Sequence, residues 1–399
     1  MATLCAEAQA RAGRSPALAL HGFTIILFFA ASSMTTPLYP LYQASWGVTA
    51  FLTSVVFAAY VGTLLVSLLF LGALSNHLGR KPVILASIVI ECIALVMFLV
   101  ATSGGWLVAA RLVQGFATGI ATTAVAAALL DVDHKQGAVI NGLAPMAGMA
   151  LGALGAGALV QFAPFPLRLI YVVALVLFAV QLVATLLSSE TFAERDRAGW
   201  SLRPRIEIPP RLRTTFLRIL PLNVAVWGLG ALFLSLMPGL LHVVTAAPSM
   251  AWLGGAEVGA MTLAGAAAVL LFRNQRRVFI RNCAAGAIIL GTAMVLTGTL
   301  LHSPILLLAG ALPTGIGFGA GFLGVLRSLV ALARPAERAG LVSAFYIASY
   351  LPNAVLAMMA GYAASHVGFF ETVVVFGSFI IVMAALSLVM KPDDPTLRH

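Results

Sequence analysis

The sequence contains few charged residues. Only 9% of its 399 residues are Asp, Glu, Lys or Arg, and 61% are hydrophobic. Soluble globular proteins contain about 25% charged residues. A chain of this composition cannot cover its surface with polar groups in water, so lipid must form part of its solvent. The composition predicts a membrane protein and excludes an ordinary soluble domain.

Acidic residues are scarcer than basic ones, with 13 against 23, which gives a formal net charge of +10. The basic residues lie in short runs between apolar segments, which is typical of membrane topology and not of a face that binds nucleic acid. The 3 cysteines show no paired spacing, so neither a disulfide framework nor a metal site is expected. Metalloprotease, nucleophile-elbow and phosphate-loop motifs are missing from the sequence. We therefore expect no enzyme and no cofactor.

Long apolar windows dominate the rest of the chain. A helix needs about 20 mostly apolar residues to cross a bilayer. Twelve such windows are present, at 18–40, 48–74, 82–101, 105–130, 137–161, 167–188, 214–240, 250–272, 279–301, 304–332, 338–364 and 370–390. The count predicts twelve transmembrane helices, the first of them an uncleaved span and not a secretory signal.

The loops between these windows differ in charge. Nearly all Lys and Arg residues fall on one side if the N-terminus is cytoplasmic, as the positive-inside rule requires. The polar stretch Ser188–Arg213 separates six windows from six. We predict an N-terminal half over residues 1–189, a cytoplasmic linker over 190–213 and a C-terminal half over 214–399. The chain is expected to be a monomeric, multi-pass protein of the cell inner (plasma) membrane with both termini in the cytoplasm.

One loop, between the second and third windows, contains Gly72, Asn76, Gly79, Arg80 and Lys81 in close succession. It resembles the signature loop of the major facilitator superfamily. The resemblance implies an all-α membrane protein with two pseudo-symmetric six-helix bundles. In that family an acid at the position of Asn76 helps to hold the two halves together on the inner side, so an amide implies a weaker contact. The alternative interpretation is a tight basic turn.

A second pattern begins in the fourth window, where Arg111 precedes Gly115 and Gly119, with Gln114 between them. It is similar to a motif of the same family in which the arginine is associated with proton coupling. A charged residue within a span normally faces a cavity or a partner. The alternative is an arginine at the outer end of the span that extends to the lipid headgroups.

A third, partial match lies in the fifth window at Pro145, Gly148 and Gly152. It resembles the signature of the superfamily's proton-antiporter and drug-efflux branch, although Ile140, Ala144 and Met149 replace glycines of that pattern. The resemblance favours export by exchange. A generic interface of small residues between helices is the alternative.

The resemblance also implies a central cavity lined by spans 1, 4, 7 and 10. It places Arg111 and Gln114 there, with Asn223 and Trp227 from the seventh window. Tyr39 and Tyr42 lie near an outer boundary, where anchoring at the lipid interface is the favoured interpretation.

Two acids lie inside predicted spans. Glu91 is near the middle of the third window, where a charge would be costly, so we expect it to be protonated or paired. A structural hydrogen bond is the alternative role. Glu257 lies at a depth similar to that of Arg111, which allows an ion pair or a shared proton site. Arg111, Glu91 and Glu257 are therefore the candidates for proton coupling.

These observations predict a secondary active transporter that moves a small solute by alternating access, with proton-coupled efflux as the leading hypothesis. The expected partners are a small-molecule substrate, protons and the lipid bilayer. Two alternatives stay open: proton-coupled uptake of a small metabolite, and a membrane sensor derived from a carrier fold that transports nothing.

Overall fold

The computed structural model describes residues 2–191, 206–245, 252–330, 332–334 and 337–390. Within these residues the regular structure is helical, and twelve segments are long and apolar enough to cross a membrane. This confirms the predicted span count, and each observed span lies over its predicted window. The middle of the expected linker, residues 192–205, lies outside the described residues.

The first set of helices occupies the N-terminal part of the chain: α1 (Ala2–Ser33), η1 (Thr36–Leu38), α2 (Tyr39–Trp46), α3 (Ala50–Leu71), α4 (Leu74–Leu78), α5 (Arg80–Leu99), α6 (Gly104–Val132), α7 (His134–Phe162) and α8 (Leu169–Leu187). The second set follows the linker: η2 (Pro210–Leu212), α9 (Arg213–Ala231), η3 (Leu232–Leu236), α10 (Met237–Thr245), α11 (Trp252–Phe272), α12 (Arg277–Leu300), α13 (Pro304–Val330), α14 (Arg338–His366) and α15 (Phe369–Val389).

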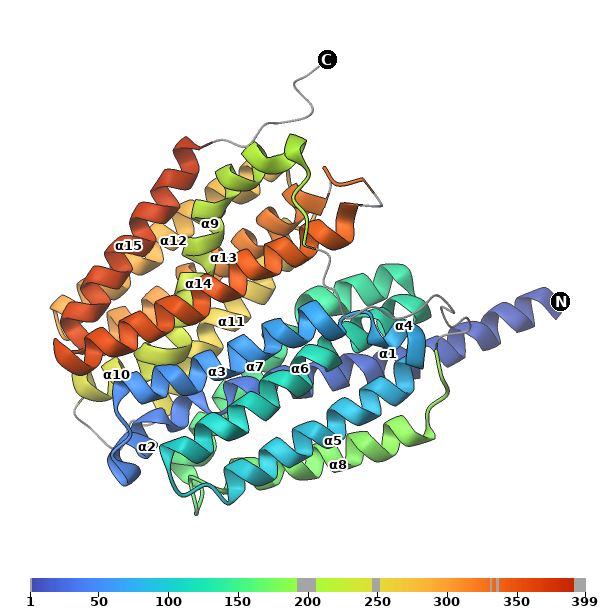
Figure 1. Cartoon of the computed structure of the whole chain (residues 1–399), viewed down its shortest axis with the longest axis horizontal. Coiled ribbons are helices and arrows are strands. Elements are labelled where there is room, and N and C mark those ends of the chain that lie inside the picture. The colour runs from blue at the N-terminus through green and yellow to red at the C-terminus, as the bar shows by residue number, and fades with distance from the viewer. Residues whose placement is uncertain (1, 192–205, 246–251, 331, 335–336, 391–399) are drawn as a thin grey trace.

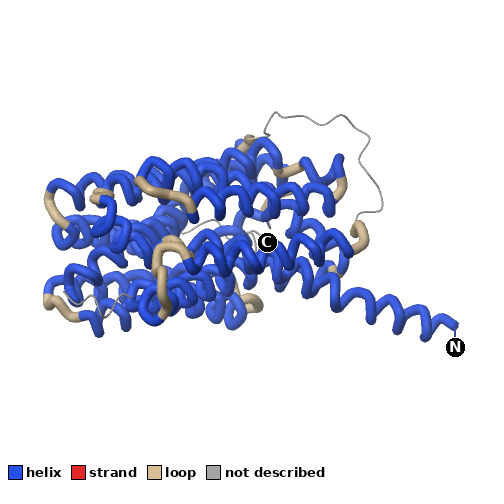
Figure 2. The backbone as a smooth tube through the Cα atoms, turned by 90° about the horizontal axis from the view of Figure 1, so that it is seen from below, coloured by secondary structure: helices blue, strands red, loops and turns tan. Residues whose placement is uncertain are grey.

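The two sets lie side by side, with α1–α8 at the lower right of Figure 1 and α9–α15 at the upper left. The long helices run in roughly one direction, and α1 extends beyond the bundle (Figure 2). We call the end of the bundle that bears α4 and the start of α9 the α4 end. The opposite end bears α2 and α10, and we call it the α10 end (Figure 1). Buried apolar side chains form two clusters, one within α1–α8 and one centred on α9–α15 that also takes in Tyr60 and other residues of α3.

The two sets meet most closely at the α10 end. The Thr36 hydroxyl donates to the Leu234 carbonyl at 3.3 Å, and the Phe51 amide donates to the Ser365 hydroxyl at 2.8 Å. At Gly361 of α14, a Cβ atom would lie 2.0 Å from the Ser54 hydroxyl of α3. Larger side chains could not enter these contacts without separating the helices.

The contact between α7 and α11 loosens toward the α4 end. A Cβ atom at Gly255 would lie 2.4 Å from the Ala153 carbonyl, whereas one at Gly265 would lie 3.3 Å from the Met146 sulfur. At Gly142, nearer the α4 end, the nearest atom would be 3.9 Å away. The pair is therefore closed at the α10 end and in ordinary contact at the other.

Two spans are irregular. The first, expected as one helix over 18–40, breaks after Ser33 and continues through η1 into α2. The seventh contains a π-helical turn, η3, which includes the Leu234 carbonyl that accepts from Thr36. A helix leaves its last carbonyl groups without partners in the helix, and the break after Ser33 exposes such groups to side chains of other spans.

Candidate functional site

Arg111 lies inside the first set of helices and is 1% exposed. One terminal nitrogen (Nη1) donates to the Ser32 carbonyl at 2.8 Å, and the other (Nη2) donates to the Tyr39 hydroxyl at 3.1 Å. The guanidinium also lies over the ring of Tyr60, 5.3 Å from its centroid. Because a cation is favourable near the C-terminus of a helix, Arg111 stabilises the end of α1 at the break after Ser33.

Gln114, one turn along α6, connects Arg111 to Glu91 of α5. Its amide oxygen accepts from Arg111 Nη1 at 2.7 Å, and its amide nitrogen donates to Glu91 Oε1 at 2.9 Å. The same nitrogen donates to the Ala31 carbonyl at 3.2 Å. Gln114 and Glu91 are both 0% exposed. The second carboxyl oxygen of Glu91 has no hydrogen-bond partner among the described residues.

These contacts define a buried polar chain, Arg111–Gln114–Glu91, which joins α6 to α1 and α5. The structure places Arg111 and Gln114 inside the first set of helices, and their predicted place in a substrate cavity stays a prediction. The alternative of an Arg111 that extends to the headgroups does not fit this burial. Glu91 makes a hydrogen bond of the kind that the structural alternative predicted, and its role in proton coupling stays a prediction.

The interpretation of Tyr39 and Tyr42 as interfacial anchors is wrong. Tyr39 is 2% exposed and accepts from Arg111, while Tyr42 is 1% exposed and its hydroxyl lies 2.6 Å from that of Tyr171. α2 continues the first span past the break and contacts α10, and both rings are covered by protein.

Glu257 of α11 is fully buried, and neither of its carboxyl oxygens has a hydrogen-bond partner among the described residues. It lies one turn from Gly254, which packs on Pro238 of α10, and one turn from Met261, whose carbonyl meets Gly315 of α13. The ion pair with Arg111 that was considered from the sequence is not formed, because Glu257 faces the interior of the second set of helices and Arg111 that of the first.

Asn223 and Trp227 come from one face of α9 and contact α14. The Asn223 amide donates to the Ala348 carbonyl at 2.9 Å, and its oxygen accepts from the Ser349 hydroxyl at 3.2 Å. Trp227 lies one turn further along, with its ring 4.5 Å from that of Tyr350. The indole nitrogen is buried and has no hydrogen-bond partner among the described residues. The two residues therefore lie on one face of α9, and their predicted place in a substrate cavity stays a prediction.

Further rings surround Trp227. Phe318 and Phe322 of α13 have centroids 6.5 and 6.3 Å from the indole, and Tyr346 lies 6.0 Å from Tyr350. Tyr350 also packs against the buried apolar cluster that includes Tyr60 of α3. This aromatic cluster thus reaches the contact between the two sets of helices.

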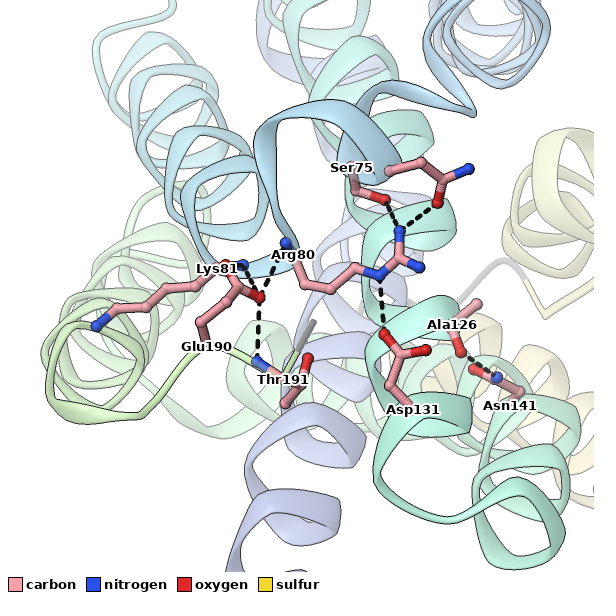
Figure 3. Close-up of polar contacts among 9 residues, drawn as sticks. Ser75, Arg80, Lys81, Ala126, Asp131, Asn141, Glu190 and Thr191 are labelled. Carbon is pink, nitrogen blue, oxygen red and sulfur yellow. Dashed lines mark hydrogen bonds and ion pairs between the residues drawn. The ribbon is translucent and has the colours of Figure 1, made fainter. Parts of the chain in front are cut away.

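The signature loop forms a second polar centre, at the α4 end (Figure 3). Arg80, which is 6% exposed, donates to the Ser75 hydroxyl at 2.8 Å and to the Asn76 oxygen at 2.5 Å. Its Nε atom forms a 3.0 Å ion pair with Asp131 at the end of α6. Each of these contacts lies within the first set of helices. Asn76 accepts a hydrogen bond from Arg80, and Asp131 supplies the carboxylate that pairs with the Arg80 guanidinium.

Glu190, just after α8, lies against the beginning of α5. Its carboxylate accepts from the backbone amides of Arg80 at 3.0 Å and of Lys81 at 3.1 Å (Figure 3). Gly79 has φ +98°, and a Cβ atom there would lie 2.6 Å from the Glu190 carboxylate. Glycine is required because it alone combines this backbone angle with room for the carboxylate. Gly72, the first glycine of the loop, lies directly after α3.

The far end of the linker is bound to the second set of helices. Arg211 pairs with Glu337 and donates to the Leu332 carbonyl at 3.1 Å. The backbone amide of Arg334, followed by the Arg211 guanidinium, lowers the pKa of Glu337. Both described ends of the linker are therefore attached to loops of the α4 end.

Gly148 and Gly152 of α7 pack against α1. Cβ atoms at these positions would lie 2.4 Å from the Ile26 carbonyl and 2.1 Å from the Ala30 carbonyl. Pro145 lies within α7, one turn before Gly148. The structure gives these residues a role in close helix packing, and a specific role in exchange stays a prediction.

Sequence reasoning missed Asp131, Glu190, Tyr60 and Tyr350. The first two had a detectable signal, because an acid directly after an apolar window can reach the basic loop of a neighbouring helix pair. The two tyrosines had none, since their positions depend on how α3 and α14 are rotated about their axes.

The fold and these buried polar groups define a multi-pass membrane protein of the transporter type. The model of the Major Facilitator Superfamily matches residues 22–350, and the chain belongs to that family. No protein among the curated sequences matches it significantly.

Several solved transporters share the fold at low sequence identity. A bacterial homologue of the human lysosomal transporter Spinster, in an inward-facing and occupied conformation, has a TM-score of 0.75 and 14% identity, covering 95% of this chain and 97% of its own. The nucleoside transporter NupG has a TM-score of 0.75 and 15% identity, with coverage of 94% and 100%. The human organic anion transporter MFSD10 has a TM-score of 0.67 and 17% identity, with coverage of 94% and 99%.

Proposed function

We propose that this transporter exports a small solute in exchange for protons by alternating access. The observation that supports it is the buried chain Arg111–Gln114–Glu91, which places a cation and an acid at the two ends of one amide. Uncompensated charge is expensive inside a membrane protein. The protonation state of Glu91 therefore decides whether the Arg111 charge is balanced.

A change at Glu91 has a physical route to the contact between the halves. Arg111 bonds the end of α1 and Tyr39 of α2, and the intervening Thr36 bonds the Leu234 carbonyl across the interface. When Glu91 loses its proton, the attraction of Arg111 toward α5 increases at the expense of its bonds to α1 and α2. That shift weakens closure at the α10 end.

Glu257 is the second proton-binding candidate. A carboxylate that is buried without a donor is much costlier than a carboxylic acid, so we propose that Glu257 carries a proton in this conformation. It would release the proton only when rearrangement of α11 against α7 admits water or a cation.

The proposed orientation places the α4 end in the cytoplasm of a cell with both termini inside, in the inner (plasma) membrane. The support is the positive-inside rule, since Arg80, Lys81 and Arg211 all lie at that end. In this orientation the structure is closed toward the outside. We further propose that the protein is a monomer. Residues 1–189 and 214–399 form its two moving halves, and residues 190–213 join them.

Transport in inside-out vesicles with an acidic lumen tests this function. Accumulation of solute in the lumen, with protons leaving it, supports export by exchange. Discharge of preloaded solute under the same gradient indicates proton-coupled uptake. A ligand that stabilises the purified chain while no solute moves would indicate a sensor.

A further inference from the structure

Two buried polar atoms on α9 and α14 have no hydrogen-bond partner among the described residues. One is the indole nitrogen of Trp227 and the other is the side-chain oxygen of Asn353. Asn353 is 4% exposed. A donor and an acceptor left unpaired at the same level are unusual, because buried polar groups are normally hydrogen-bonded.

The register of α9 and α14 places the residues that carry these atoms at one level of the helix pair. Both helices begin at the α4 end, and Asn223 bonds Ser349. Trp227 lies one turn after Asn223 and Asn353 one turn after Ser349, so the two residues face each other across the same pair of helices. The ring of Tyr350 is tilted by 55° against the indole, with the two centroids 4.5 Å apart, and it lies between these two levels.

The surroundings of the two atoms are flat and uncharged. Phe318, Phe322 and Tyr350 present rings toward the indole. Arg111, in the other half, is already bonded to Ser32, Gln114 and Tyr39. An anion would therefore enter with its charge unmatched, and a quaternary cation, although attracted to ring faces, has no acceptor for the Trp227 N–H group.

We propose that Trp227 and Asn353 are the specificity-determining pair for a flat, neutral heteroaromatic substrate with adjacent acceptor and donor groups. The Trp227 N–H group donates to a ring carbonyl, and the Asn353 oxygen accepts from the neighbouring ring N–H. The surrounding rings stack on the two faces. The inference rests on the proposed transport function and specifies its substrate class.

Entry requires movement of the rings that now pack together. Tyr350 packs against the buried cluster that includes Tyr60 of α3, and α3 contacts α14 between the two sets of helices. Separation of α3 from α14 would uncover this side of the cluster, so the site opens with the same rocking motion that transports the substrate.

Calorimetric titration of the purified full chain tests the substrate class with a matched set of bicyclic compounds. Carbostyril has adjacent N–H and C=O groups, N-methylcarbostyril lacks the donor, and quinoline keeps only a ring acceptor. N-methylquinolinium is the cation of similar shape and quinaldate the anion. We expect carbostyril to bind about three- to tenfold more tightly than N-methylcarbostyril, which is the effect of one hydrogen bond.

Two conservative variants locate the site. Trp227→Phe keeps a ring without its N–H group, and Asn353→Leu keeps the volume without the acceptor. Each should weaken carbostyril binding by about three- to tenfold. Asn353→Leu should also remove the preference for carbostyril over its N-methyl form. Trp106→Phe, on a half-exposed side chain of α6, is the matched control and should bind as the unmodified chain does.

Several results would overturn the proposal. These are tighter binding of the quinolinium or quinaldate, equal binding of carbostyril and its N-methyl form, absence of binding by any of the five compounds, or unchanged affinity in both variants. Equilibrium binding needs no proton gradient. A failure of proton exchange would instead appear as normal carbostyril selectivity with no proton movement in vesicles.

Discussion

Lys81, at the beginning of α5, stabilises the end of α8, and Glu190, just after α8, stabilises the beginning of α5. The Lys81 ammonium donates to the carbonyls of Leu186 and Ser188 at 2.7 Å, at the end of α8. The Glu190 carboxylate accepts from the amides at the beginning of α5. A cation at a C-terminus and an anion at an N-terminus both oppose the helix dipole. The signature loop is thus attached to the first residues of the linker.

Glu190→Ala should lower the stability of the chain by about 1 kcal/mol, the usual effect of losing an N-cap. Lys81→Ala should act in the same direction, because it frees the carbonyls at the end of α8. The measurement is the midpoint of thermal unfolding in detergent. Lys135→Ala, at an exposed position on the same end of the bundle, is the control. Unchanged midpoints for both test variants would show that neither contact stabilises the fold.

A pair of substitutions can transfer the carboxylate that contacts Arg80 from position 131 of α6 to position 76 of α4. Asp131→Asn removes the ion pair of a buried guanidinium and should cost about 1.5–3 kcal/mol, the value of a hydrogen bond to a charged group. Adding Asn76→Asp to the same chain supplies a new carboxylate at the other Arg80 contact, so the double variant should regain part of the loss in thermal unfolding.

The same pair of variants tests the idea that an acid at position 76 changes the balance between conformations. Asn76→Asp alone should change the labelling rate of cysteine probes placed between α7 and α11 near Gly142. Identical labelling in both forms, or a double variant no more stable than Asp131→Asn, would contradict this account of the loop.

Gln114→Leu should uncouple Arg111 from Glu91. We expect gradient-driven transport to fall by about tenfold or more, because a hydrogen bond to a charged group is lost on each side of the amide. Gln181→Leu is a close control. Gln181 is also buried and bonds Thr24 and Leu20, so both variants should lose similar stability. A similar loss of transport in Gln114→Leu and Gln181→Leu would show that Gln114 has only a structural role.

Glu257→Gln should preserve the stability of the chain and abolish proton-driven transport. The amide resembles the protonated acid in shape and charge, so the conformation seen here should tolerate it. Thermal unfolding and proton flux are measured on the same preparation, with Glu371→Gln at the beginning of α15 as the control. A large loss of stability would mean that Glu257 is ionised and paired in the folded protein, and normal flux would exclude it from coupling.

The helices could be predicted from the sequence because lipid imposes one requirement on every span: enough apolar residues to cross. Side-chain partners could not be predicted in the same way. Counting residues along the predicted spans placed Arg111 and Glu257 at similar depth. Depth does not give the rotation of a helix about its axis, and the two residues face different interiors. The break after Ser33 was also missed, because Thr36 and Tyr39 are apolar enough in context to continue the window. The end of α1 at this break supplies the Ser32 carbonyl that binds Arg111 and the Ala31 carbonyl that binds Gln114.

The most direct test of the account is to measure solute and proton movement together in inside-out vesicles with an acidic lumen and a pH-sensitive dye inside. Carbostyril added outside should accumulate in the lumen while the luminal pH rises, and Arg111→Ala should abolish both changes although the protein is still inserted. Carbostyril uptake without a change in luminal pH, or unchanged exchange in Arg111→Ala, would contradict the claim that the Arg111–Gln114–Glu91 chain couples protons to transport.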